Sequence, residues 1–348
     1  MVRHSLLGKL PTHLRLLAVA SLLPCLDMAL PPALRLADLM RPIFIFAILG
    51  LGLNVVSGFT GMLNLGVSAF MAIGAYSYAI LTCDIYPFQL GFWTALLLTM
   101  LCGTLAGVLL GLPTIRLRGD YIAIVTLGFG EIVQDALKNL DTISKGTQGI
   151  NPLPGPSFFG YTLDSGGYLL SYYLFLAILS VLVVLNLNLQ ESRLGRAWIS
   201  LREDELASAC MGIYPVRTKL AAFSIGAALC SLSGALWASY LGTSGEPGNY
   251  DFQLSIIALC IVIVGGLGSI NGVLIGSLVM VGFNSILLSK LSTFLTSQGI
   301  ISGNSVFTSP NNWKCLIFGL ALILMMRLKP SGLAPACRPK AARLHEGT

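Results

Sequence analysis

The sequence is divided by stretches that contain no charged residue and are long enough to cross a membrane. No Asp, Glu, Lys or Arg lies within 42–83, 85–115, 165–190, 220–245 or 252–289. A helix needs about 20 apolar residues to cross the hydrocarbon core. Helices are expected because an open sheet leaves backbone groups unsatisfied in lipid, and barrel strands would alternate at every second residue. The pattern therefore predicts an all-α, polytopic transmembrane helical bundle.

The spacing of these stretches predicts about ten spans, with eight or nine if some Gly-broken segments only dip into the bilayer. The first and last stretches each have room for two helices, and the other three for one each. Three further spans are expected at 16–34, 121–137 and 313–326. Only 10% of the residues are charged, and 55% are hydrophobic. Soluble proteins carry about 25% charged residues, so the composition excludes soluble enzymes, disordered chains and nucleic-acid binders.

The distribution of Lys and Arg predicts the orientation of the bundle. With about ten spans and both termini in the cytosol, the inner segments hold most of the basic residues, as the positive-inside rule requires. The formal net charge of +6 then reports membrane topology. We expect a multi-pass protein in contact with the lipid bilayer and without a nucleic-acid partner.

The sequence has no motif for catalysis or for holding a cofactor. It lacks a GxxxxGK[ST] loop, and its histidines, His4, His13 and His345, all lie in the tails. No CxxC pair or HExxH motif indicates a metal site. We expect no enzymatic activity, so energy for uphill transport must come from a partner or from an ion gradient.

Two segments rich in Gly and small polar residues interrupt the hydrophobic pattern. Gly58, Gly61 and Asn64 in the first repeat the Gly-x-x-Gly-x-x-Asn spacing of Gly265, Gly268 and Asn271 in the second. Transporters place such broken helices around solute sites, whereas close packing through small residues is the alternative. Both segments fall near the cytosolic side, which indicates parallel repeats. The candidates for a translocation pathway here are Asn54, Gly58, Gly61, Asn64, Ser68, Gly265, Gly268 and Asn271.

A third segment, 121–135, contributes the candidates Thr126, Gly128 and Glu131. Asp120 is placed to cap this helix. Glu131 falls near the bilayer centre, where a carboxylate costs at least ~2.5–3.5 kcal/mol, so we expect it to face the protein interior. It belongs either to the transport path or to a structural hydrogen bond with a neighbouring helix. Asp135 shares the face of Glu131 and is expected to be solvated.

The longest cytosolic loop, 192–215, predicts an amphipathic helix over 197–211 that ends at Gly212 and Pro215. Its charges have mixed sign, whereas a helix held by anionic lipid is mainly basic. We therefore favour docking of a partner protein over a membrane-surface role. The candidates are Arg196, Trp198, Arg202, Glu203, Asp204 and Glu205. The external stretch 138–167, rich in Pro and Gly, is either a second docking site or a connector.

Several motifs resemble those of branched-chain amino-acid ABC-transporter permeases of the LivM type. They are the segment 117–132, Gly195-Arg-Ala-Trp198 with Leu201-Arg-Glu-Asp-Glu205, the segment 219–227, Val264-Gly-Gly-Leu-Gly-Ser269 and Lys329-Pro-Ser-Gly-Leu333. The similarity covers roughly residues 42–333. In the external loop, Thr147-Gln-Gly-Ile150 departs from the Pro-Asn-Gly-Ile more usual in the family.

The resemblance implies a permease subunit paired with a LivH-type permease. Two cytosolic ABC ATPase subunits and an external solute-binding protein would complete the importer, in the cytoplasmic (inner) membrane of a bacterium. The loop around Arg202–Glu205 would be the coupling helix that contacts an ATPase. The solute would be a branched-chain or related apolar amino acid, although related permeases move urea, amides or sugars. The implied domains are 1–41, with the first transmembrane helix, 42–333, the permease domain, and 334–348, a cytosolic tail.

Two other classes of function remain compatible with the residues. One is a stand-alone secondary transporter driven by protons through Glu131 and Asp135. The other is a passive channel for a small polar solute. The absence of a second buried acid or base argues against proton coupling.

Overall fold

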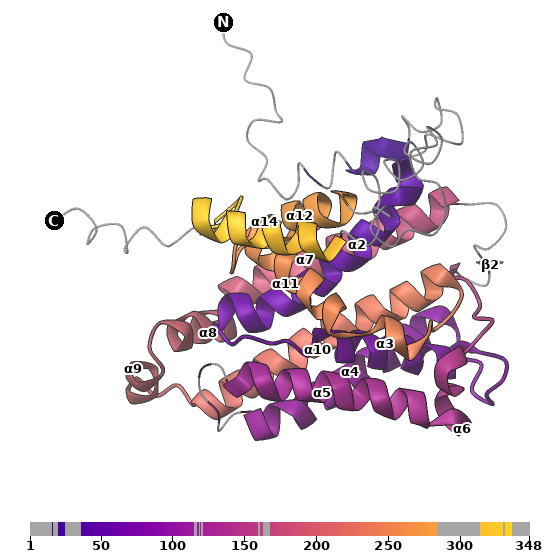
Figure 1. The fold of residues 1–348 in the computed structure, drawn as a ribbon, viewed down its shortest axis with the longest axis horizontal. Helices are drawn as coiled ribbons and strands as arrows, with labels where there is room; N and C mark the ends of the chain where they lie inside the picture. Colours follow the sequence, from indigo (N-terminus) through magenta and orange to yellow (C-terminus); the bar gives the residue numbers. More distant parts are fainter. Residues whose placement is uncertain are drawn as a thin grey trace, which may run out of the picture.

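The chain folds almost entirely into helices, in a computed structural model that describes residues 16, 20–24, 36–114, 117, 119, 121–158, 161–162, 168–283, 314–329 and 331–335. The longer helices run along one common direction (Figure 1). Within the described residues, β-structure is limited to one hairpin that pairs β1 (Ser157–Phe158) with β2 (Tyr161–Thr162). The predicted all-helical class is confirmed.

Most of the longer helices fall in the charge-free stretches, and two others fall at the further spans expected over 121–137 and 313–326. The longer ones are α2 (Leu36–Leu53), α3 (Val67–Thr82), α4 (Phe92–Thr114), α5 (Tyr121–Asn139), α7 (Tyr168–Glu191), α10 (Pro215–Leu241), α11 (Phe252–Gly265), α12 (Ile270–Gly282) and α14 (Lys314–Leu328). The shorter ones are η3 (Asn54–Phe59), α6 (Asp141–Ser144), η4 (Gly146–Gln148), α8 (Arg193–Glu203), α9 (Glu205–Cys210) and η5 (Pro247–Asn249).

Among the described residues, 5 helical stretches are long and apolar enough to cross a membrane: Leu39–Phe59, Phe92–Thr114, Leu169–Glu191, Pro215–Leu241 and Pro247–Gly265. α3 and α12 are apolar but shorter. The expected first span over 16–34 lies outside the described residues, except for 16 and 20–24. The chain is therefore a multi-pass membrane protein.

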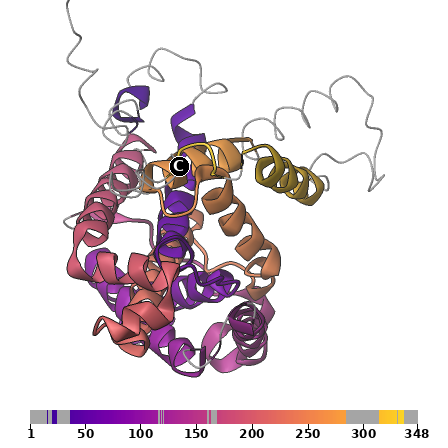
Figure 2. The same cartoon turned by 90° about the vertical axis from the view of Figure 1, so that its left-hand side faces the viewer.

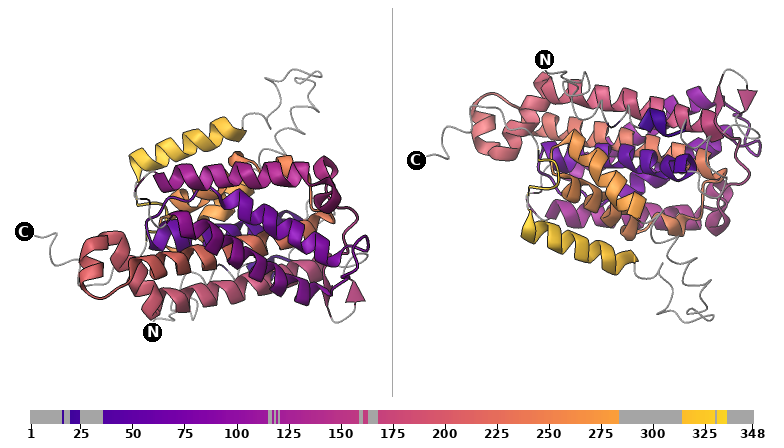
Figure 3. Two further views of the ribbon diagram at one scale, coloured as in Figure 1. Left: turned by 90° about the horizontal axis from the view of Figure 1, so that it is seen from below. Right: turned by 90° about the horizontal axis from the view of Figure 1, so that it is seen from above.

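The two ends of the bundle differ. α8 and α9 project beyond one end, and α6 with the hairpin lies at the other (Figures 1 and 3). Figure 2 views the molecule from the α8–α9 end, with α14 at the outer edge of the bundle. We call these the α8–α9 end and the α6 end.

The centre of the bundle is built on α10, which packs against α2, α3 and α4. Small residues allow the backbones to approach closely. A Cβ atom at Gly74 would collide with the backbone of Ser231, and one at Gly234 with the backbone of Met71. The Ser231 hydroxyl also donates a hydrogen bond to the Phe70 carbonyl, at 3.0 Å. These contacts fix α3 against α10 almost without intervening side chains.

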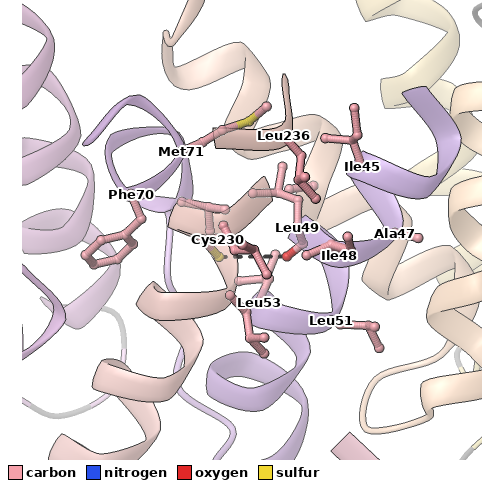
Figure 4. Close-up of a cluster of buried hydrophobic side chains, with 14 of the residues drawn as sticks. Ile45, Ala47, Ile48, Leu49, Leu51, Leu53, Phe70, Met71, Cys230 and Leu236 are labelled. Atoms are coloured by element: carbon pink, nitrogen blue, oxygen red, sulfur yellow. Dashed lines mark hydrogen bonds between the residues drawn. The ribbon is translucent and has the colours of Figure 1, made fainter. Parts of the chain in front are cut away.

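A continuous apolar core joins α2, α3 and α10 (Figure 4). Ile45 and Leu49 of α2 are fully buried, as is Met71 of α3. The Cys230 thiol of α10 lies 3.8 Å from the Leu49 carbonyl. Within the Leu39–Phe59 span, 89% of its 18-residue apolar window is buried, compared with 39% for the Phe92–Thr114 span. α2 is thus a central helix and α4 a peripheral one.

The segment after α5 is held in place at the α6 end. The Tyr86 hydroxyl donates to the Ile143 carbonyl at 2.5 Å. The Ile150 amide donates to the Ser244 hydroxyl oxygen at 2.8 Å, and the Leu153 amide to the Gly242 carbonyl at 2.9 Å. Gly149, in the motif that departs from the usual family sequence, has φ +68° and no room for a Cβ atom against Gly245. Residues 143–153 are therefore held against two interhelical loops, one at Tyr86 and one at 242–245.

Candidate functional site

The first predicted interruption begins where α2 changes into the wider η3 turn. Residues 54–59 form a π-helix, and no helix covers 60–66. π-Turns leave α-helical hydrogen bonding and are frequent at functional sites. The Asn54 side chain accepts a hydrogen bond from the Gly268 amide, at 2.9 Å. The predicted break is confirmed, and it contacts the second break directly.

The second interruption is a tight turn between α11 and α12. Gly266 and Gly268 have φ +122° and +82°, values that L side chains rarely adopt. Ser269 then caps α12 by accepting a hydrogen bond from the Gly272 amide at 3.1 Å. From the far end of the sequence, the Leu333 amide donates to the Val264 carbonyl, and the Ala334 amide to the Gly265 carbonyl. These two backbone hydrogen bonds hold the C-terminal segment against the turn, which gives the Lys329-Pro-Ser-Gly-Leu333 motif a structural role.

Arg202 of α8 joins the two breaks. Its guanidinium donates a hydrogen bond to the Gly58 carbonyl at 2.6 Å. A Cβ atom at Gly61 would lie 2.9 Å from the Arg202 side chain, and one at Gly268 would lie 3.2 Å from its guanidinium. The glycines of both breaks therefore leave the space that this side chain occupies. Because Arg202 is itself exposed, solvent screening limits what this bond contributes to stability, and its main effect is to position α8.

Trp198 fixes the same helix on the bundle. The indole is fully buried, stacks on Phe59 of η3 with 6.4 Å between ring centroids, and donates to the Thr218 carbonyl at 2.8 Å. Trp198 is buried, whereas Arg202 is exposed along part of its side chain and uses its guanidinium to reach Gly58. They attach α8 to the first break and to α10.

The predicted single helix over 197–211 is wrong, because the chain bends at Asp204. Asp204 has extended backbone angles, and its carboxylate accepts hydrogen bonds from the Leu206 and Ala207 amides. An Asp in this position caps the start of a new helix. The result is α8 followed by α9. A 2.8 Å ion pair between Glu205 and Lys219 then ties α9 to α10.

The prediction that Glu131 faces the interior of this chain is wrong. Glu131 and Asp135 lie on the exposed side of α5, and Asp135 pairs with Lys138 at 3.4 Å. Thr126 lies on the opposite, buried side, where its hydroxyl oxygen accepts from the Leu65 amide at 3.0 Å. The Asp120 cap lies outside the described residues. α5 thus has a structural face with Thr126 and an outer face with two carboxylates.

The remaining candidates have local structural contacts. The Asn64 side chain accepts from the Gly66 amide, and Ser68 contacts Ser255 of α11 through its amide and its hydroxyl. Gly265 packs on the backbone of Gly272, and the exposed Arg196 donates to the Glu191 carbonyl. Phe59 and Thr218 carried no sequence signal, because they act through ring stacking and a backbone carbonyl.

Two buried polar atoms in these breaks have no hydrogen-bond partner among the described residues: the Ser57 hydroxyl oxygen and the Asn271 side-chain oxygen. An unpaired buried polar group costs about 1–3 kcal/mol. The breaks are otherwise tightly packed. In this conformation each of the two interrupted segments therefore contains one buried oxygen that could form a further hydrogen bond.

Comparison with known proteins decides the family. Residues 35–326 match the family described as "Branched-chain amino acid transport system / permease component". The chain belongs to this permease family. The permease is 38% identical over 324 residues to the high-affinity branched-chain amino acid transport system permease protein LivM of Salmonella typhimurium, which covers 87% of the permease and 71% of that protein. With LivM of Escherichia coli the identity is 37% over the same shares.

The permease is also related to a second kind of subunit. The LivH permease protein of Escherichia coli is 22% identical over 305 residues, which covers 83% of the permease and 90% of LivH. No solved structure matches the permease significantly.

Proposed function

We propose that the chain is the membrane subunit of an ABC importer that translocates branched-chain or related apolar amino acids, with ATP hydrolysed by separate subunits. The hydrogen bond from Arg202 to the Gly58 carbonyl carries this proposal. It connects a helix that projects from the bundle to both interrupted segments. If an ATPase subunit displaces α8, the displacement would therefore be transmitted to both interrupted segments.

The proposed assembly contains a LivH-type permease, two cytosolic ABC ATPase subunits and an external solute-binding protein. The relationship of the chain to both LivM and LivH supports the permease pair. About ten spans, both termini in the cytosol and a bacterial inner-membrane location complete the proposed topology. Residues 42–333 would form the permease domain, with 1–41 and 334–348 as flanking segments.

The surface proposed to contact an ATPase is the exposed side of α8 and α9. Arg196 and Glu203 lie on it, with Leu206 and Met211, whose exposed fractions are 68% and 86%. Large apolar side chains surrounded by charges are typical of protein contacts. Trp198 and the hydrogen bond from Arg202 to Gly58 then attach this surface to the bundle, and Asp204 and Glu205 maintain its two-helix shape.

The proposed solute path runs beside the breaks and the outer face of α5. Few charged groups occur in the membrane-spanning part, which suits an apolar side chain. Glu131 offers a carboxyl group to the ammonium group of an amino acid, and Gly128 lies one turn before it. Asn271 offers its unpaired oxygen as a hydrogen-bond acceptor. The glycines at 58, 61, 265 and 268 are proposed to permit movement of the path walls.

The test compares variants of α8 in the complete importer. We expect Arg202→Ala to retain the ATPase subunits during purification but to reduce leucine uptake at least tenfold, because the motor is no longer connected to the breaks. Arg202→Lys keeps the charge without the reach of the guanidinium and should also be impaired. Glu203→Ala should instead weaken ATPase retention. Normal uptake by Arg202→Ala would contradict the proposed coupling.

A proton-driven transporter is the second candidate, through Glu131 and Asp135. The ion pair between Asp135 and Lys138 disfavours it, because a paired carboxylate at the helix end is a poor proton carrier within a relay. Uptake by the purified chain alone under a pH gradient would favour it, and flux without ATP in either direction would indicate a channel.

A further inference from the structure

The two sides of α5 differ in what they contact. Its inward side, with Ile122, Thr126 and Gln134, is buried against the bundle. Its outward side exposes large apolar residues together with the two carboxylates: Tyr121, Ile124, Ile132, Glu131 and Asp135. Nothing in the described part of the chain covers this outward side.

Hydrogen bonds at two levels fix the depth of Glu131 in the bundle. Thr126 accepts from Leu65, two residues before α3 begins, and Ser68 of α3 contacts Ser255 of α11, so this level lies inside the bundle. Gln134 donates to the Pro247 carbonyl, at the start of the Pro247–Gly265 span near the α6 end. Glu131 lies about 7.5 Å beyond Thr126 along the helix, at 1.5 Å per residue. It therefore lies between the ends of neighbouring spans.

A carboxylate at this depth does not face hydrocarbon at equilibrium without a large cost. The outward side of α4 shows what a lipid-facing surface of this protein contains: Leu97, Leu101, Leu105, Leu109 and Leu112, all more than half exposed and without a charged neighbour on that helix. The outward side of α5 is similarly exposed, but it carries two carboxylates among its apolar side chains. Lipid is therefore the expected neighbour of α4 and an unsuitable one for α5.

The surface of α5 also has room for a close neighbour. A Cβ atom at Gly128 would find no other atom within 4 Å, and Gly128 lies one turn before Glu131. Small residues in spanning helices let a second helix approach closely, and polar groups beside them hydrogen-bond across the contact. The notch at Gly128 and the carboxylate of Glu131 thus suit a helix that brings a hydrogen-bond donor.

We propose that the outward side of α5, defined by Ile124, Gly128, Glu131, Ile132 and Asp135, is the surface on which the second, LivH-type permease packs. The inference rests on the proposed importer and adds which helix of this chain forms the contact. The partner presents a hydrogen-bond donor or a cation opposite Glu131, because that carboxylate has no partner among the described residues of its own chain. The contact removes Glu131 from lipid and lines the space between the subunits.

Photo-cross-linking in membranes tests this assignment. A benzophenone amino acid replaces Ile124 or Ile132 on α5, and Leu101 or Leu105 on α4 as matched controls, in the complete importer. We expect at least tenfold more adduct with the second permease from the α5 positions than from the α4 positions. Adducts with lipid only, or with a second copy of this chain, from α5 would overturn the proposal.

A second measurement leaves the chain unsubstituted. A lipid-soluble carbodiimide should label Glu131 when the chain is expressed alone, and at least fivefold less when it is co-expressed with the second permease; Glu131→Gln identifies the labelled residue. Equal labelling in both samples would overturn the inference. ATP-driven leucine uptake by the same membranes is measured separately, so that failure of the importer proposal is distinguished from failure of the α5 contact.

Discussion

α4 and α5 are neighbouring helices at the periphery of the bundle, yet their outward sides differ in kind. α4 exposes a row of leucines, with Leu105 at 62% exposure, and α5 exposes Ile132 at 68% beside Glu131. Both sides lack a neighbour among the described residues. The exposed fraction of a side chain therefore does not by itself tell whether a membrane helix faces lipid or another protein. The free-energy cost of placing that side chain in lipid must be considered as well.

The strongest test exchanges the chemistry of the two sides. We expect Leu105→Glu on α4 to lower the amount of inserted, folded chain about a hundredfold, because it places a carboxylate in lipid at a cost of about 2.5–3.5 kcal/mol. The measurement is the yield of folded chain in the membrane fraction. Leu105→Met is the control and should be neutral. Normal yield of Leu105→Glu would remove the assignment of α4 to lipid.

The converse change is Glu131→Leu on α5. For the chain expressed alone we expect unchanged or higher yield, since a carboxylate leaves the lipid-facing surface. In the complete importer we expect about tenfold less second permease in affinity purification and a matching loss of uptake. Unchanged purification of the second permease would argue that Glu131 lies outside the contact.

The notch on α5 allows a smaller, steric test. Gly128→Leu fills open space in this chain and should leave its own thermal stability almost unchanged, while it reduces co-purification of the second permease about threefold to tenfold. Gly319 on α14 is a matched control, because a Cβ atom there also meets nothing within 4 Å. Equal effects of Gly128→Leu and Gly319→Leu would show that the notch has no special neighbour.

The smallest expected effect concerns the inward side of α5. Thr126→Val removes the acceptor of the Leu65 amide and should destabilise the chain by about 1 kcal/mol. We expect a decrease of a few degrees in the melting temperature in detergent and no change in subunit assembly. A loss of assembly instead would mean that the inward and outward sides of α5 are not independent.

The sequence predicted the helices well, because the absence of charge over a span is a strong and local signal. It also predicted both interruptions, since Gly and small polar residues in an apolar helix weaken it wherever they occur. It did not predict that Asn54 contacts Gly268 or that Arg202 lies between Gly58, Gly61 and Gly268. These contacts depend on how helices distant in the sequence are arranged, which single-sequence patterns do not contain.

The errors have similarly physical causes. Glu131 is expected inside because a charge avoids lipid, yet it lies on the exposed side of α5 in this chain, and the proposed contact with a second permease would account for the difference. The helix over 197–211 was expected to be continuous because its apolar residues recur with helical spacing. Asp204 interrupts it by capping a new helix, a local hydrogen bond that competes successfully with continuation.

The most direct measurement of the central claim is leucine accumulation in proteoliposomes. The chain is reconstituted alone under a pH gradient and, in parallel, with the second permease, the ATPase subunits and the solute-binding protein in the presence of ATP. Our account predicts accumulation against a gradient only in the complete assembly, and its loss when ATP is omitted. Accumulation of leucine by the chain alone would contradict the claim that transport is driven by separate ATPase subunits.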